Sequence, residues 1–266
     1  MTEAVPAPER VEALMERERQ RFADSHPKSR QLHERAEASL LSGVPMNWMT
    51  RWPGDFPVFI SEASGATLVD VDGHRYADLC LGDTGAMSGH SPPPTVAALA
   101  DRAARGITTM LPSEDAAVVG EEMSRRFGVE RWQFTLSATD ANRFAIRIAR
   151  ETTGRPKVLV FNHCYHGTVD ETFASLDGTG RVVMRPGNVG PPVALEETTR
   201  VVEFNDVDGL ERELAIGDVA CVLTEPALTN IGIVLAERGF HDRLRELTRS
   251  TGTLLIIDET HTLCCG

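Results

Sequence analysis

The sequence of 266 residues has very little lysine, since Lys28 and Lys157 are its only two. It also lacks an apolar run long enough to span a bilayer, which argues against a transmembrane protein. Lysine and arginine together number 27 against 39 aspartates and glutamates, a net charge of −12. Binding to a phosphate polymer needs clustered basic residues, so a nucleic acid is not an expected partner. The acidic N-terminus, MTEAVPAPER, does not resemble a signal peptide.

Cysteine is scarce and scattered. The five cysteines are Cys80, Cys164, Cys221, Cys264 and Cys265. An odd and irregularly spaced set of this kind indicates reduced thiols rather than a disulfide framework, which favours a cytoplasmic protein. Hydrophobic residues make up 41% and charged residues 25% of the chain, as in ordinary globular proteins.

The N-terminal part is predicted to be a helical segment followed by a hairpin. Residues 1 to about 8 are expected to be disordered, and His26-Pro27 separates two helices predicted over Glu9–Phe22 and Gln31–Leu41. Short strands are predicted over Val58–Ile60, Thr67–Val71 and Arg75–Leu79, with Asp72-Gly73 as a hairpin turn. We therefore expect a helical segment with a loop over residues 1–56 and a β-hairpin region over residues 57–80.

A strand, turn, helix and strand are predicted from Trp132 to Phe161. Trp132–Leu136 is an apolar run, and Ser137–Asp140 is a small polar turn. The helix begins near Ala141, with an apolar stripe at residues 141, 144, 145, 148 and 149 and arginines 143, 147 and 150 opposite it. Gly154 and Pro156 end the helix before the buried strand Lys157–Phe161. The start of such a helix can hold a phosphate on its free backbone N–H groups.

The rest of the chain continues this alternation. Further strands are predicted over Val201–Phe204, Val219–Thr224 and Thr253–Ile257, and helices over Pro94–Arg105, Ser113–Phe127 with Ser113 as N-cap, Val207–Leu214 and Phe240–Thr251; Asp177–Pro192 is predicted to be a surface loop. The pattern predicts an α/β fold with a mostly parallel sheet and helices on both faces. Ligands bind such sheets at the carboxyl ends of the strands. Asp258 lies there, directly after the apolar run LLII.

Several motifs in this order resemble class III aminotransferases. They are Ser137-Ala138-Thr139-Asp140-Ala141, Ile146-Arg147-Ile148-Ala149-Arg150, Thr153-Gly154-Arg155 and Cys164-Tyr165-His166-Gly167. Within that class the chain most resembles the glutamate-1-semialdehyde aminomutase branch, from roughly Pro57 to its end. The resemblance implies a pyridoxal-phosphate-dependent enzyme of fold type I, with residues 81–266 as an incomplete large domain and no C-terminal small domain.

The resemblance also implies a set of site residues. Ser137, Ala138 and Thr139 would cradle the phosphate, although the family usually has glycine where Ala138 stands. Tyr165 would stack on the ring with His166 beside it, and Asp258 would keep the ring nitrogen protonated. Glu225 and Asn230 would approach the ring hydroxyl, Thr260 replaces a usual valine under the ring, and Arg51 resembles a binder of the substrate carboxylate. Of these, Tyr165 and Asp258 are the expected catalytic residues.

In the family the Schiff-base lysine follows the pair Asp258-Glu259 at some distance, and neither Lys28 nor Lys157 fits that position. We therefore expect the N-terminal portion of an aminotransferase or aminomutase, inactive by itself, acting when whole as a homodimer on an amino acid or keto acid. The cofactor residues do not distinguish transamination from amino transfer within one molecule.

Three alternatives remain open. The chain could be a non-catalytic α/β protein that binds a cofactor or a partner. It could be an unrelated nucleotide-binding fold, although it lacks a G-x-G-x-x-G or P-loop pattern. His163, Cys164 and His166 could bind a metal, but neighbours on an extended strand point to opposite faces, so we expect no metal site. An incomplete parallel sheet also has an unpaired edge, which predicts aggregation.

Overall fold

The computed structural model describes residues 7–190 and 193–263. The chain divides into two compact units, Met1–Leu111 and Pro112–Gly266. The elements of the first unit are α1 (Pro8–Ser25), α2 (Pro27–Glu37), the 3₁₀ helices η1 (Leu41–Gly43) and η2 (Asn47–Thr50), β1 (Ile60–Ser64), β2 (Thr67–Asp70), β3 (Arg75–Ala77) and α3 (Pro93–Ala104). The elements of the second unit are α4 (Asp115–Phe127), α5 (Ala138–Thr153), β4 (Lys157–Phe161), η3 (Asp170–Thr172), β5 (Ala174–Leu176), β6 (Val182–Met184), α6 (Leu195–Thr198), β7 (Thr199–Val202), α7 (Val207–Ala215), β8 (Val219–Thr224), α8 (Phe240–Thr251) and β9 (Leu254–Ile257).

The first unit joins a helix pair to a three-stranded antiparallel sheet in the order β1-β2-β3. Both helices begin at a proline, a residue whose fixed φ suits the first helical turn. The predicted turn at Asp72-Gly73 connects β2 to β3, and Gly73 takes a φ of +96° there. Asp72 also accepts hydrogen bonds from the backbone N–H groups of Lys28 and Ser29, at 2.7 and 3.0 Å, so the turn is tied to the first residues of α2. The first strand was predicted too early, since it begins at Ile60.

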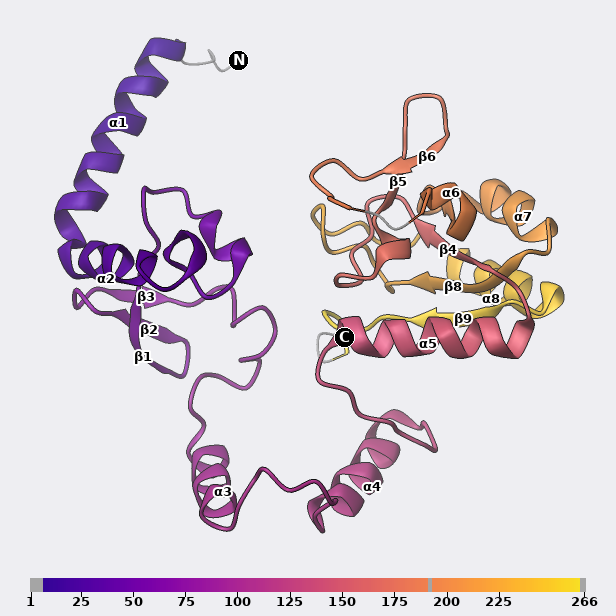
Figure 1. Cartoon of the computed structure of the whole chain (residues 1–266), viewed down its shortest axis with the longest axis horizontal. Coiled ribbons are helices and arrows are strands. Elements are labelled where there is room, and N and C mark those ends of the chain that lie inside the picture. Colours follow the sequence, from indigo (N-terminus) through magenta and orange to yellow (C-terminus); the bar gives the residue numbers. More distant parts are fainter. Residues whose placement is uncertain (1–6, 191–192, 264–266) are drawn as a thin grey trace. The chain divides into compact units, whose positions relative to one another are not determined.

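The second unit contains a four-stranded parallel sheet in the order β7-β4-β8-β9. Helix α5 covers one face, and α7 and α8 cover the other (Figure 1). Strand β8 is buried along its whole length, because it has a strand on each side and helices above and below. Phe161, Phe204 and Phe240 pack edge to face in the core, with ring centroids 5.0 to 5.6 Å apart. The predicted α/β fold with a parallel sheet is confirmed.

Two predictions around the sheet were wrong. Trp132–Leu136 forms no strand, and Leu136 is fully exposed, because no described strand lies beside it to supply hydrogen bonds. The predicted loop Asp177–Pro192 in fact contains β6, which pairs with β5 in a small antiparallel hairpin.

Among the described residues β9 pairs only with β8, so its other edge is open.

The predicted caps and faces of two helices also need correction. Helix α4 begins at Asp115 with Glu114 at its N-cap, while Ser113 donates instead to the carboxylate of Asp115 at 3.0 Å. On α5 the buried positions are Asn142, Ile146 and Ala149, of which the predicted apolar stripe contained only Ala149. The stripe is largely exposed: Phe144 is 55% and Ile148 64% accessible.

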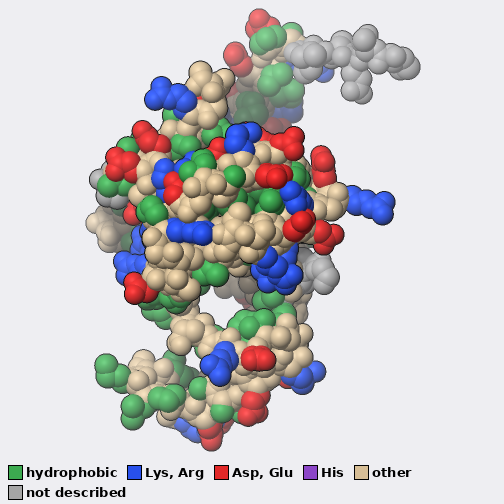
Figure 2. All heavy atoms as spheres, turned by 90° about the vertical axis from the view of Figure 1, so that its right-hand side faces the viewer, with side chains coloured by type: hydrophobic (Ala, Val, Ile, Leu, Met, Phe, Trp, Pro, Cys, Tyr) green, Lys and Arg blue, Asp and Glu red, His purple; other side chains and the backbone are tan. Residues whose placement is uncertain are grey.

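The surface carries charges of both signs. On the face of the molecule shown in Figure 2, lysine and arginine side chains are interspersed with aspartate and glutamate. Within residues 7–190 and 193–263, no helix combines the length and apolar character needed to cross a bilayer. Cys80, Cys164 and Cys221 are free thiols, and the last two are buried; Cys264 and Cys265 lie outside the described residues.

Candidate functional site

A pocket of about 180 Å³ lies at the carboxyl ends of the parallel strands in the second unit. It is lined by Ser137, Ala138, Thr139, Tyr165, Gly167, Glu225, Asp258, Thr260, His261 and Thr262. Three separate strands deliver these residues: Tyr165 follows β4, Glu225 directly follows β8, and Asp258 directly follows β9. This is the edge at which parallel α/β sheets bind ligands.

One wall of the pocket is the start of α5. Ser137 is the N-cap, and its hydroxyl oxygen accepts the backbone N–H of Asp140 at 3.2 Å. Ala138 and Thr139 are the first two helical residues, whose N–H groups have no acceptor within the helix. Those N–H groups and the positive end of the helix dipole favour an anion. Ala138 does not need the backbone freedom of the glycine usual in the family, because it already belongs to the helix.

The loop that carries Tyr165 closes tightly on the same helix start. Gly167 has a φ of +76°, and a Cβ added there would lie only 2.1 Å from Oγ1 of Thr139. The next residue, Thr168, donates its backbone N–H to that same Oγ1 at 3.1 Å. Glycine at position 167 therefore sets the spacing between the loop and the anion-binding end of α5.

Asp258 is the most extensively hydrogen-bonded group in the pocket. Its Oδ2 accepts Nδ2 of Asn142 and Nδ1 of His166, both at 2.9 Å. Its Oδ1 accepts the backbone N–H of Thr260 at 3.1 Å and the Thr260 hydroxyl at 2.6 Å. Asp258 is only 9% exposed, so its position and charge are fixed by these four donors.

The two buried ionisable groups stabilise each other's charge. Burial alone would raise the pKa of Asp258, but the hydrogen bonds from His166, Thr260 and Asn142 hold it well below its usual range. Burial alone would lower the pKa of His166, but its hydrogen bond to Asp258, the charge of Asp258 and the proximity of Cys164 raise it to about 9. At neutral pH the pocket therefore contains a carboxylate supported from behind by an imidazolium.

A second hydrogen-bond network links two other residues of the pocket lining, Glu225 and His261, through Thr229. Glu225 is 3% exposed, and its Oε2 accepts the Thr229 hydroxyl at 2.6 Å and the Thr229 backbone N–H at 3.1 Å. The Thr229 hydroxyl lies 2.8 Å from Nδ1 of His261, which lines the pocket. The other carboxylate oxygen of Glu225 accepts the backbone N–H of Tyr165 at 3.4 Å. Tyr165 itself is 44% exposed and lines the pocket, so part of the residue is accessible to a ligand.

The structure brings most of the predicted site residues together. Ser137, Ala138, Thr139, Tyr165, Glu225, Asp258 and Thr260 all line the pocket. His166 is 1% exposed and lies behind Asp258 rather than at the pocket wall. Asn230 is exposed and does not line the pocket, and Arg51 is an exposed residue of the other unit.

Sequence reasoning missed four residues that shape the site: Asn142, Gly167, His261 and Thr262. Asn142 lies on a helix face where an apolar residue would be expected, and its burial is the signal that it serves a buried partner. His261 and Thr262 follow the Asp258-Glu259 pair and were not assigned a role. Gly167 was quoted only as part of a motif, although positive φ and close approach are what glycine provides.

The chain is similar to known proteins over most of its length. The family model for class-III aminotransferases matches residues 48–264. The glutamate-1-semialdehyde 2,1-aminomutase of Haloarcula marismortui is 37% identical over 242 residues, which are 90% of this chain and 53% of the relative. The chain thus spans about half the length of the curated relatives it matches.

The chain is also similar to solved structures of aminomutases and transaminases. A glutamate-1-semialdehyde aminomutase from Pseudomonas aeruginosa PAO1 is 52% identical with a TM-score of 0.94, covering 98% of this chain and 57% of its own. A lysine-to-alanine variant of that protein was solved in complex with PMP, with the same identity, TM-score and coverage. An omega-transaminase from Sphaerobacter thermophilus is 34% identical with a TM-score of 0.80, covering 87% of this chain and 54% of its own. The chain belongs to the class-III aminotransferases.

Proposed function

We propose that this chain forms the cofactor-binding part of a pyridoxal-phosphate-dependent enzyme that moves an amino group on amino-acid-like substrates. The observation that carries the proposal is that the start of α5, Tyr165 and the carboxylate of Asp258 line the same pocket. These are the three kinds of group that the cofactor needs from a protein besides a lysine: a phosphate site, a ring-stacking surface and an acid partner for the ring nitrogen. The sequence resemblance and the PMP complex of a 52% identical protein support the same cofactor.

The residues present fit that cofactor. The N–H groups at the start of α5 would hold its phosphate, and the half-exposed ring of Tyr165 would cover one face. Asp258 lies at the pocket wall with four hydrogen-bond donors already holding it ionised. A carboxylate in this state would hold a proton on the pyridine nitrogen.

When bound, pyridoxal phosphate supplies a protonated ring that accepts the negative charge left on the substrate carbon as its proton departs. Asp258 would keep the ring nitrogen protonated, because the carboxylate itself stays ionised. Asn142, His166 and Thr260 would prevent it from turning away or accepting the proton. The network of Glu225, Thr229 and His261 would orient further polar groups of the pocket lining.

Lys157, the lysine of the unit that contains the pocket, is not placed to bond covalently to a cofactor there. Lys157 opens β4 at its amino end, where Nζ donates to the backbone carbonyl of Glu196 at 2.9 Å and lies 3.7 Å from Asp218. Lys28 belongs to the other unit. We therefore expect the chain to bind the cofactor non-covalently, and this also keeps open the second candidate function, a cofactor-binding protein without catalysis.

Titration of the chain with PMP and with pyridoxal phosphate tests the cofactor site. We expect saturable binding, followed by the absorbance of the bound cofactor, that is lost in Asp258→Asn. Asp170→Asn, which removes an exposed carboxylate outside the pocket, is the matched control and should bind normally. Equal affinity in wild type and Asp258→Asn would contradict the proposed site.

Activity of the whole protein separates the two candidate functions. With pyridoxal phosphate and an amino donor, the chain is expected to show no turnover above that of free cofactor, because the lysine that moves the proton is not in its pocket. Turnover above that level would mean that another group replaces the lysine. Cofactor binding without turnover would be consistent with both an enzyme portion and a non-catalytic binder, so transfer of the labelled amino group by the whole protein is the deciding measurement.

Three further assignments remain proposals. Arg51 would bind the substrate carboxylate, which the planar guanidinium suits. The whole protein would act as a homodimer on an amino acid or keto acid. A cytoplasmic location is supported by the free thiols of Cys80, Cys164 and Cys221.

A further inference from the structure

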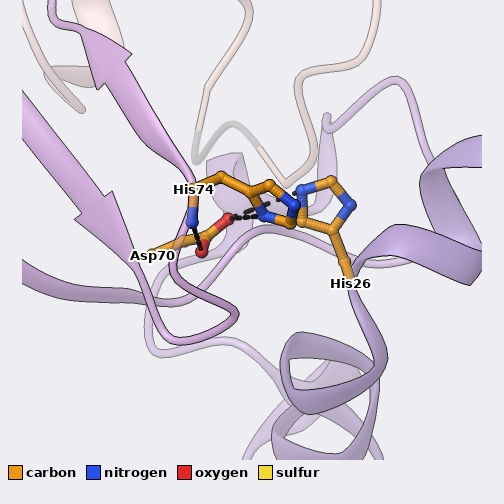
Figure 3. A group of neighbouring side chains, drawn as sticks. All are labelled: His26, Asp70 and His74. Atoms are coloured by element: carbon orange, nitrogen blue, oxygen red, sulfur yellow. Dashed lines mark hydrogen bonds and ion pairs between the residues drawn. The ribbon is translucent and has the colours of Figure 1, made fainter.

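Three potential metal-binding side chains meet in the first unit, where the helix pair joins the β2-β3 hairpin (Figure 3). One coordinating atom each from His26, Asp70 and His74 lies within 4.8 Å of the other two. We propose that these three residues bind one divalent transition-metal ion of the Zn²⁺ class. The site would be structural, and it is independent of the proposed cofactor pocket in the second unit.

The distances between the potential ligands suit such an ion. Oδ2 of Asp70 lies 2.9 Å from Nδ1 of His74 and 3.5 Å from Nε2 of His26. A tetrahedral zinc ion with bonds of about 2.0–2.1 Å would separate its ligand atoms by about 3.3–3.4 Å. These two separations lie on either side of that value, and the third, between the two histidine nitrogens, is at most 4.8 Å, so the histidine rings would rotate toward the ion as it binds.

Asp70 is held so that one oxygen faces the histidines. Its Oδ1 accepts the backbone N–H groups of Asp72 and His74, at 2.9 and 2.8 Å, within the hairpin turn. Its Oδ2 faces His26 and His74 (Figure 3), and the side chain is fully buried. The carboxylate is therefore already oriented as a one-oxygen ligand before any ion binds.

His26 presents a second nitrogen to the same oxygen of Asp70. Its Nδ1 lies 2.8 Å from the carbonyl oxygen of Phe22 and 2.9 Å from Oγ of Ser25. A hydrogen bond from Nδ1 to a backbone carbonyl is the outer contact typical of a metal-bound histidine, and it leaves the Nε2 lone pair free to coordinate. Oη of Tyr76 lies 2.9 Å from that Nε2 and 2.7 Å from Asp70 Oδ2. An ion between Nε2 and Oδ2 would therefore lie beside the Tyr76 hydroxyl.

The surroundings favour a metal ion and give it access. Asp72 adds a second carboxylate next to the site, so the neighbourhood is negatively charged. The His74 side chain is 42% exposed, which leaves a route from solvent and room for water or the Tyr76 hydroxyl as fourth ligand. Because His26 lies between α1 and α2 and the other two residues lie on the hairpin, the ion would fasten the helix junction to the sheet.

Metal titration of the chain, without an affinity tag and after chelator treatment, tests the proposal. Zn²⁺ binding is measured by calorimetry and Co²⁺ binding by visible absorption, which is much stronger for four-coordinate than for six-coordinate Co²⁺. We expect one Zn²⁺ per chain and a four-coordinate Co²⁺ spectrum. His74→Asn should weaken Zn²⁺ binding about 100-fold while the fold is retained, because the new amide can still donate to Asp70.

The control is His163→Asn, which removes a histidine from the second unit at a φ of +65° that asparagine tolerates. It should bind Zn²⁺ like the wild type, and zinc should raise the melting temperature of both but not of His74→Asn. His26→Asn should lose zinc binding in the same way. A six-coordinate Co²⁺ spectrum, or equal Zn²⁺ affinity in His74→Asn, would overturn the proposal.

Discussion

Nδ1 of His166 lies 2.9 Å from Oδ2 of Asp258, and the two side chains are 0% and 6% exposed. The pair thus forms a buried ion pair directly behind the pocket wall. Buried charges of this kind persist only when their partners are in place. The stability of the second unit should therefore depend on pH in a way that this pair determines.

We predict that the free energy of unfolding falls as the pH rises from 6.5 to 9. The folded-state pKa of His166 is raised, so its contribution is complete below the unfolded value and is lost as the pH rises through about 9. The loss should be about 1–3 kcal/mol. The pKa of Asp258 shifts in the opposite direction, so its contribution is complete above its ordinary pKa and is lost progressively as the pH falls below that value.

Urea denaturation across this pH range measures the effect. His166→Gln should be less stable at pH 6.5 and should lose most of the slope toward pH 9. Parallel pH profiles for wild type and variant would mean that other groups cause the change.

Substitution of Thr260 tests whether its hydroxyl orients the carboxylate of Asp258. The Thr260 hydroxyl donates to Oδ1 of Asp258 at 2.6 Å. Thr260→Val keeps the shape but removes this donor, and should lower the unfolding free energy by about 1–2 kcal/mol. Because the family usually has valine at this position, PMP affinity should fall by less than in Asp258→Asn. Thr260→Ser keeps the hydroxyl and is the matched variant; it should bind PMP nearly as well as wild type. If both variants bind equally, the hydroxyl does not support Asp258.

Gly167 should not tolerate a side chain. Alanine there would have both a φ of +76° and a Cβ about 2 Å from Thr139 Oγ1, so we expect a loss of about 2–4 kcal/mol in unfolding free energy and weaker cofactor binding. Gly178→Ala meets open space in the same unit and should change little. Thermal denaturation compares the two, and a stable Gly167→Ala protein with unchanged PMP affinity would argue against a fixed spacing.

Elements that depend on residues close together in the sequence could be predicted. The strands Lys157–Phe161 and Val219–Thr224 and the helix Phe240–Thr251 have the bounds expected from their apolar patterns, because burial on both faces and local helix signals are encoded in neighbouring residues. Asp258 was recognisable because a charge directly follows an apolar run. The resemblance to a family then added Tyr165 and Glu225 to the site.

Other features depend on partners distant in the sequence. Trp132–Leu136 has a strand-like composition, yet a strand forms only beside another strand, and none of the described ones lies next to it. Asn142 lies on the buried face of α5 and donates to Asp258. Because Asp258 is 116 positions further along the chain, no pattern near Asn142 reveals this partner. The cluster of His26, Asp70 and His74 likewise depends on how a helix junction meets a hairpin, which no local pattern records.

The open edge of β9 should promote self-association of the chain. Leu254 and Ile257 on this strand are 38% and 41% exposed, and unpaired strand edges template aggregation. We predict that Leu254→Lys slows aggregation, measured by light scattering during incubation at fixed concentration. Ile216→Lys adds the same charge at a 56% exposed position outside the sheet and should slow it less. Equal effects would attribute the change to net charge instead.

All the pocket-lining residues come from the second unit, whereas Arg51, the proposed contact for the substrate, belongs to the first. If Arg51 has the role proposed for it, mutations that alter substrate choice could accumulate in one unit without changing the pocket of the other. Such a division would let relatives diverge in specificity while they inherit the same chemistry.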